Sequence, residues 1–179
     1  MSLLYYGTLA EANTYFDERL HADAWTDAVS TDREKAMNQA RISIDNLNFK
    51  GVKSAVYDIL YDSNGDLYTG TSIPTEAAII TAGESQALEF PRGSDDSVPE
   101  QIKQAQWECA ITILDGVDPD SEYETLRVLR QGYSSVSTTY NSSDVNSEHL
   151  VYGIVSPTAW RLLYPFLLFD GSLVISRVN

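Results

Sequence analysis

Hydrophobic positions recur every three or four residues along three stretches of the chain, a spacing typical of helices that bury one face. The first helix is expected at about Leu9 to Leu20, where Thr8 and Glu11 form a capping box at its start. The second is expected after another capping box at 31–34 and ends at Gly51. The pattern therefore predicts a helical N-terminal part.

The third helix is the best delimited and is expected to be the centre of the fold. Ser97 stands at the N-cap position with Glu100 three residues later, Pro99 falls in the first turn, and Gly116 supplies the stop. Its apolar positions are Val98, Ile102, Ala105, Cys109 and Ile113. Because so wide an apolar face needs neighbours on more than one side, the three helices are expected to form a small bundle.

The stretch between the second and third helices has a residue pattern typical of strands rather than helices. Residues 55–61 are rich in β-branched and aromatic side chains, 62–66 contain an Asn-Gly pair, and 67–69 resume the strand pattern. We therefore expect a β-hairpin inserted at about 52–89, within which 76–82 fits either a helical turn or a strand.

Beyond Gly116, an acidic loop leads into a segment that alternates and contains many Ser and Thr residues. This segment predicts an extended arm or a second hairpin that hinges at Gly132, followed by a polar linker over 141–148. Ser156 as N-cap and Pro157 at the first helical position then predict a terminal helix. Pro165 should kink or end that helix, and a turn at Asp170 and Gly171 and a short strand over 173–175 should follow.

The expected fold class is mainly α with β additions (α+β). Residues 1–116 are expected to form the small helical bundle with its inserted β-hairpin at about 52–89. Residues 117–179 are expected to form an extended arm, a terminal helix and a short strand.

The charge of the chain is distributed unevenly. The whole chain of 179 residues has a net charge of −14. Residues 150–179 carry +1, so the first 149 residues carry −15. Because so acidic a body repels phosphate backbones, sequence-independent binding to nucleic acid is disfavoured. The start of the chain has no basic segment, and its longest apolar run, 162–169, has eight residues, so neither a signal peptide nor a membrane span is expected.

The nearly uncharged end of the chain, 150–179, is rich in aromatic residues. Interface centres are enriched in Trp, Tyr and Arg and depleted of acidic residues, so this segment predicts a contact with another chain. The candidate interface residues are Trp160, Arg161, Tyr164, Phe166 and Phe169. Deleting 150–179 should then leave the helical body folded; the alternative, that this segment completes the core, stays open.

Catalytic and metal-binding patterns are weak. His21 and His149 have no ligand partner at helical spacing, and Cys109, the single cysteine, is expected to fill the core. Residues 62–66 match the first positions of a calcium loop, but Leu67 and Ile73 stand where Gly and Glu are needed. We expect no enzyme and assign no catalytic, cofactor or metal residues, although a pair of carboxylates that act together cannot be located from sequence.

Four stretches taken together resemble a known family. They are 6–16 (Tyr-Gly-Thr-Leu-Ala-Glu-Ala-Asn-Thr-Tyr-Phe), 44–51 (Ile-Asp-Asn-Leu-Asn-Phe-Lys-Gly), the corner 90–92 (Phe-Pro-Arg) with 98–105 (Val-Pro-Glu-Gln-Ile-Lys-Gln-Ala), and 156–165 (Ser-Pro-Thr-Ala-Trp-Arg-Leu-Leu-Tyr-Pro). In this order they look like the head-to-tail adaptor (connector) proteins of tailed bacteriophages, a family often labelled DnaT-like. The insertion at 52–89 is longer than that family leads us to expect.

The resemblance implies a structural virion protein that forms a ring, commonly a dodecamer, at the portal vertex or neck after assembly in the host cytoplasm. Its implied partners are the portal protein and a tail protein of the nozzle or tail tube. Genomic DNA would pass through the ring without sequence-specific binding, and no cofactor is implied. The alternative function is that of a single-stranded-DNA-binding replication accessory, which the acidic charge argues against. Because the charged bodies repel one another, we expect a monomer or weak oligomer in the absence of a partner.

Overall fold

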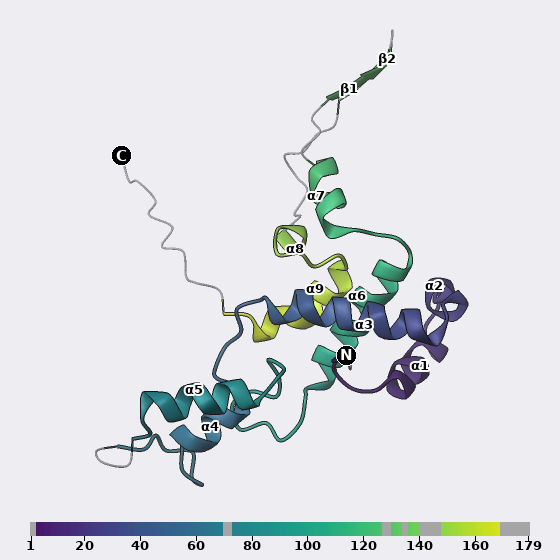
Figure 1. Cartoon of the computed structure of the whole chain (residues 1–179). Coiled ribbons are helices and arrows are strands. Elements are labelled where there is room, and N and C mark those ends of the chain that lie inside the picture. Colours follow the sequence, from purple (N-terminus) through teal and green to yellow (C-terminus); the bar gives the residue numbers. More distant parts are fainter. Residues whose placement is uncertain (1–2, 70–72, 127–129, 134–135, 140–147, 169–179) are drawn as a thin grey trace, which may run out of the picture.

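The computed structural model describes residues 3–69, 73–126, 130–133, 136–139 and 148–168, and it is mainly helical (Figure 1). The helices are α1 (Leu9–Asp17), α2 (Asp23–Asp27), α3 (Ser30–Asp45), α4 (Ser54–Leu60), α5 (Glu76–Ser85), α6 (Glu100–Leu114), α7 (Pro119–Leu126), α8 (Glu148–Val151) and α9 (Pro157–Leu163), followed by the 3-10 helix η2 (Tyr164–Phe166). The strands are β1 (Arg130–Tyr133) and β2 (Val136–Thr139).

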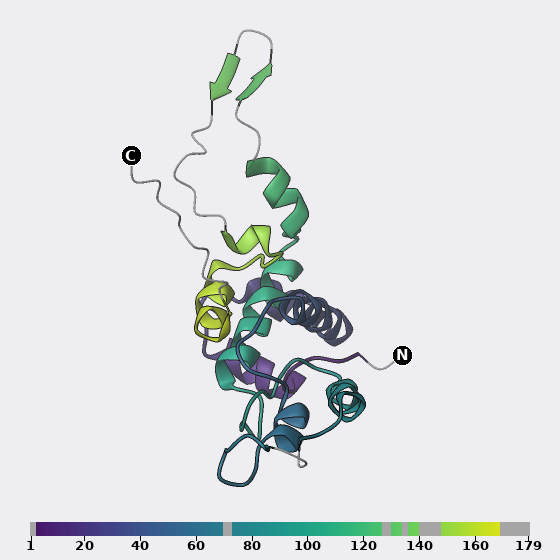
Figure 2. The same cartoon turned by 90° about the vertical axis from the view of Figure 1, so that its left-hand side faces the viewer.

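Helix α6 is the centre of the fold, as its sequence predicts. It packs against α3 and α9 and also contacts α1 and α2, so its apolar side chains are covered from several directions. The side chains of Ile102, Trp107 and Cys109 are almost completely buried there. Figure 2 shows α3 and α9 on different sides of α6.

The predicted capping boxes have different outcomes. At α1 the box is confirmed: the N–H of Glu11 donates to Oγ1 of Thr8 at 3.2 Å, and Oε2 of Glu11 accepts from the N–H of Thr8 at 2.7 Å. The boxes predicted for α3 and α6 are wrong. These helices begin after Val29 and Pro99, which have extended backbones and make no side-chain cap hydrogen bond.

The side chains of the two rejected boxes bind elsewhere. Glu34 accepts a hydrogen bond from the hydroxyl of Tyr5 at 3.1 Å, and Glu100 pairs with Lys103 at 2.7 Å, so neither carboxylate binds the cap. The stop at Gly116 is confirmed, because its φ of 87° is one that glycine adopts without strain.

The inserted β-hairpin predicted at about 52–89 is not formed: the insertion folds mainly as helices α4 and α5. The segment predicted as the first strand is mainly α4, where Tyr57 stacks on Tyr61, the residue after the helix, with the ring centroids 4.3 Å apart. Strand propensity depends strongly on packing, and here Val56 packs against Gly83 of α5 rather than against a neighbouring strand. Residues 76–82, which fit a turn of helix or a strand, belong to α5.

The turn of that predicted hairpin is nevertheless present. Oδ1 of Asp62 accepts hydrogen bonds from the N–H groups of Asn64 and Asp66 at 2.8 and 3.0 Å. Tyr61 and Leu67 form an isolated antiparallel bridge across the turn. The predicted turn at 62–66 is therefore confirmed, whereas the strand predicted before it is helical.

The second predicted hairpin is formed by β1 and β2, which pair antiparallel with Arg130 opposite Thr139. Gly132 lies within β1, opposite Ser137, rather than at a hinge. The acidic segment that starts at Asp118, expected as a loop, leads directly into α7, which lies beside α8. Figure 2 shows the hairpin beyond the end of α7, away from the bundle.

The expectation that 150–179 lies outside the core is wrong for its described part. Ile154, Ala159 and Leu163 are completely buried, and they share one apolar cluster with α3 and α6. The prediction that Pro165 kinks or ends the helix is confirmed, because α9 ends at Leu163 and only the short 3-10 helix η2 runs through Pro165. Leu167 then bridges to Phe49 in an antiparallel pair. Of the linker predicted over 141–148, Glu148 belongs to α8 and the rest lies outside the described residues. The turn predicted at 170–171 and the strand predicted over 173–175 also lie outside them.

Candidate partner-binding surface

A groove of about 580 Å³ lies between α8 and α9 and brings together three of the five predicted interface residues. It is lined by Glu148, His149, Pro157, Trp160, Arg161 and Tyr164. We call it the α8–α9 groove.

Helix α9 fixes the groove by burying its other face. The hydroxyl of Ser156 accepts from the N–H of Ala159 at 3.3 Å, and Pro157 occupies the first turn, so the helix start is as its sequence predicts. Ala159 and Leu163 are fully buried. Arg161, between them, is exposed and lines the groove, and Trp160 lines it while also packing against the core.

Trp160 is held in place by a neighbour on the approach to α9. Its indole ring stacks on the ring of Tyr152, with the centroids 5.4 Å apart and the planes 15° apart. Tyr164, one helical turn further on, is 51% exposed. A rigid aromatic surface of this kind loses little conformational freedom on binding, which favours its use in an interface.

Arg161 is the electrostatic feature of the groove. It is exposed, and among the lysines and arginines whose side chains the structure describes, each of the others makes an ion pair or a hydrogen bond to a backbone carbonyl, whereas none is observed for Arg161. Burial lowers the pKa of the neighbouring His149 below its usual value, so that imidazole is neutral at neutral pH. The groove thus presents a guanidinium beside aromatic rings, and the carboxylate of Glu148 also lines it. The guanidinium can bind a partner's carboxylate through two parallel hydrogen bonds.

The other two predicted interface residues are not part of this groove. Phe166 packs edge-on against Phe90, with centroids 5.9 Å apart, and lines a separate cavity of about 250 Å³ with Lys50 and Arg92. Phe169 lies outside the described residues.

Arg92, a residue to which the sequence analysis assigns no role of its own, joins its own segment to residues 50 and 51 beside that cavity. Its Nη2 donates to the carbonyl of Gly51 at 2.6 Å, its Nε donates to the carbonyl of Lys50 at 3.0 Å, and its Nη1 pairs with Glu89 at 2.6 Å. The planar guanidinium can serve several acceptors at once, whereas an ammonium cannot reproduce this geometry. The sequence feature that could have indicated this role is the position of Arg92 directly after the Phe-Pro corner.

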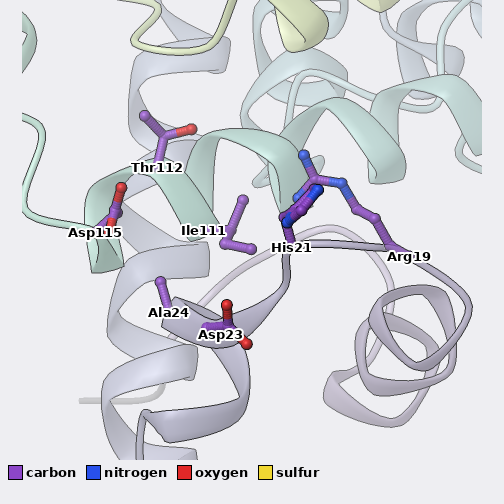
Figure 3. Close-up of a pocket in the computed structure, with 7 residues that line it drawn as sticks. All are labelled: Arg19, His21, Asp23, Ala24, Ile111, Thr112 and Asp115. Carbon is purple, nitrogen blue, oxygen red and sulfur yellow. The ribbon is translucent and has the colours of Figure 1, made fainter.

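A further cavity, of about 320 Å³, lies between the segment after α1, the start of α2 and the end of α6 (Figure 3). Arg19 lines it and pairs with the buried Glu108 at 2.9 Å, so its charge is already compensated. Asp23 and Asp115 add two carboxylates to the lining. This charge balance is unfavourable for a phosphate or carboxylate ligand.

No cluster of three or more His, Cys, Asp or Glu side chains that could hold a metal is found among the described residues. Burial raises the pKa of the Cys109 thiol to about 12, so it carries almost no thiolate at neutral pH. None of the described helices is both long and apolar enough to cross a membrane.

Comparisons of the chain with protein-family models, with curated proteins and with solved structures find no match.

Proposed function

We propose that this chain is a structural virion protein without enzymatic activity: a head-to-tail adaptor that forms a ring and joins the portal at the capsid vertex to the tail. The observation that carries the proposal is that the four stretches which resemble this family contact one another. The backbone of Tyr6 pairs with Gln106, which follows directly on 98–105, and the hydroxyl of Tyr6 donates to Asp45. Residues that are separated in sequence thus belong to one structural unit.

The remaining stretches join the same unit. Arg92 of the Phe-Pro-Arg corner binds the carbonyl of Gly51, and the N–H of Lys50 donates to the carbonyl of Phe166 at 2.9 Å, just after the Ser-Pro-Thr-Ala-Trp stretch. Stretches that contact one another support the resemblance more strongly than four isolated matches would, because their order and their packing depend on one fold.

The α8–α9 groove supports a binding role. It combines aromatic rings with a guanidinium for which no ion pair is found among the described residues, and such surfaces provide anchors for protein partners. The partners proposed here are the portal protein, a tail protein and further copies of this chain, with a dodecamer as the expected ring. The acidic body is also compatible with DNA that passes without binding.

Imaging of virions tests this proposal directly. Particles of the phage that encodes the chain should bind an antibody to this protein at one vertex, between head and tail, and particles lacking the protein should have filled heads without tails. Label spread over the whole capsid, or absent from purified particles, would contradict the proposal.

Binding to single-stranded DNA separates the proposal from the alternative. The purified protein at moderate salt should bind an oligonucleotide more weakly than micromolar. Micromolar affinity that falls steeply with salt would instead favour the replication accessory.

A further inference from the structure

Helix α5 presents an apolar surface that nothing in the described part of the chain covers. None of its residues is buried, and its neighbour in the fold is α4, on the side where Gly83 meets Val56. On the outer side, Ile80 is 53% exposed and Ile73, just before the helix, is 56% exposed. Isolated exposed apolar residues are common, but here Ile80 of α5 and Ile73, just before the helix, are both more than half exposed.

Two carboxylates bracket this apolar surface. Glu76 and Glu84 lie four residues before and after Ile80, one helical turn away on the same face, and both are exposed. We call the exposed side formed by Ile73, Glu76, Ala77, Ile80 and Glu84 the α5 stripe. It offers an aliphatic centre between two negative charges.

The α8–α9 groove has the complementary character. Arg161 supplies a guanidinium without an ion pair among the described residues, and Trp160 and Tyr164 supply aromatic surface beside it. A partner with carboxylates next to aliphatic side chains fits this groove, because Arg binds carboxylates and the rings cover apolar groups. The α5 stripe has both features.

The two surfaces cannot meet within one chain as it is folded here. Figures 1 and 2 show α5 at the end of the molecule that lies away from α7 and α8. A contact between the stripe of one molecule and the groove of another joins different surfaces, so each copy keeps one stripe and one groove free. Such a head-to-tail contact closes into a ring when the rotation between neighbours permits.

We propose that the α5 stripe of one copy binds the α8–α9 groove of the next copy, with Arg161 placed between Glu76 and Glu84 and with Ile80 against Trp160 and Tyr164. This inference deepens the proposed function and rests on its ring, since it names a second copy of this chain as a partner of the groove. It also gives the insertion at 52–89 a role, because α5 belongs to that insertion.

Cross-linking between two cysteine variants tests the contact. Ile80→Cys and Tyr164→Cys are introduced in separate chains, and the native Cys109 is buried and does not compete. A short bismaleimide should join the two variants when they are mixed at high protein concentration, while either variant alone should stay uncross-linked. A chain that carries both substitutions should give a ladder of products above the dimer.

A matched control uses Ile42→Cys, which is similarly exposed at 46% but lies on α3. It should give no product with Tyr164→Cys. Cross-linking captures weak and short-lived contacts, so equal yields for Ile42→Cys and Ile80→Cys, or no product from either, would overturn the inference. Cross-linking of Tyr164→Cys with itself would indicate a two-fold contact instead.

Charge reversal provides a second, independent measurement. Arg161→Glu and Glu84→Arg should each lower the association constant of the copies by about tenfold, and the double variant should recover most of the loss. Lys35→Glu and Glu18→Arg make the same changes of net charge at other exposed positions and should have little effect. Equal effects at test and control positions would show that only overall repulsion is measured and would overturn the inference.

These results can be separated from those on the proposed function. If copies associate through these surfaces but the protein is absent from virions, the contact stands and the adaptor role fails. If the protein lies at the portal vertex while the cross-link is missing, the adaptor role stands, and the groove binds the portal or tail protein.

Discussion

The side-chain amide of Gln106 pairs with both backbone polar groups of Tyr6. The N–H of Tyr6 donates to Oε1 at 2.6 Å, and Nε2 donates to the carbonyl of Tyr6 at 3.2 Å, with both residues completely buried. The hydroxyl of Tyr6 in turn donates to Asp45 of α3. The N-terminal segment is therefore hydrogen-bonded to the central helix and to a second helix at once.

Gln106→Ala should destabilise the protein by about 2 to 4 kcal/mol, because it leaves the N–H and the carbonyl of Tyr6 buried without partners. Denaturant unfolding followed by circular dichroism measures the loss. Gln101→Ala, an exposed glutamine on the same helix, is the control and should stay within about 0.5 kcal/mol of the parent. Equal unfolding free energies for the two variants would show that water replaces the hydrogen bonds lost by Tyr6.

Stability should fall as the pH rises above about 10, the ordinary pKa of tyrosine. Burial, and then hydrogen bonds to Asp45 and Glu108, raise the pKa values of Tyr6 and Tyr15 in the folded protein. A raised folded pKa means that the unfolded chain loses its proton first, so the stabilisation is complete below the unfolded pKa and is lost above it.

The Tyr6→Phe/Tyr15→Phe double variant should be less stable at neutral pH but should lose stability less steeply in alkali. Unfolding free energies measured from neutral pH to about pH 11 give the two slopes. Part of the slope should remain, because the pKa values of Tyr5 and Lys103 are also raised. Parallel curves for parent and variant would contradict the assignment.

Arg92→Ala should cost about 1.5 to 3 kcal/mol, because charged hydrogen bonds to the carbonyls of Lys50 and Gly51 are lost together. Arg92→Lys should lie closer to the alanine variant than to the parent, because an ammonium cannot bind the same acceptors in one plane. Lys35→Ala removes an exposed ion pair and should change little. Full recovery by lysine would show that only the charge matters.

The helical part of the fold could be predicted because its sequence signals are local. The spacing of Ile102, Ala105 and Cys109 placed the buried face of α6, and Gly116 marked its end. The caps at Ser97 and Thr31 could not be decided in this way, since a side chain that can cap a helix can also bind a neighbour. Only the packed structure selects between these alternatives.

The insertion and the C-terminal part depended on contacts between distant residues. Residues 55–61 have strand propensity, but packing against α5 makes them helical. The tail looked like an uncovered surface because it lacks charge, yet Leu163 and Leu167 lie in the core beside α6 and Phe49. The groove residues Trp160, Arg161 and Tyr164 were predicted from composition, whereas Glu108 and Gln106, both buried, follow no apolar pattern and were missed.

Two adjacent residues of the C-terminal part should respond in opposite ways to truncation. Leu163→Ala should destabilise the protein by about 2 to 5 kcal/mol, because Leu163 is completely buried and its removal leaves a cavity beside α6. Tyr164→Ala should stay within about 0.5 kcal/mol of the parent, since its ring is 51% exposed, while weakening the association of copies.

Because Leu163 and other residues after 153 are buried, a chain that ends at residue 153 should fail to form the native bundle. This reverses the outcome expected from sequence. Thermal melts and analytical ultracentrifugation of the three variants check this. A stable fold without residues 154–168, or a large loss of stability in Tyr164→Ala, would contradict the division of this segment into a buried face and a binding face.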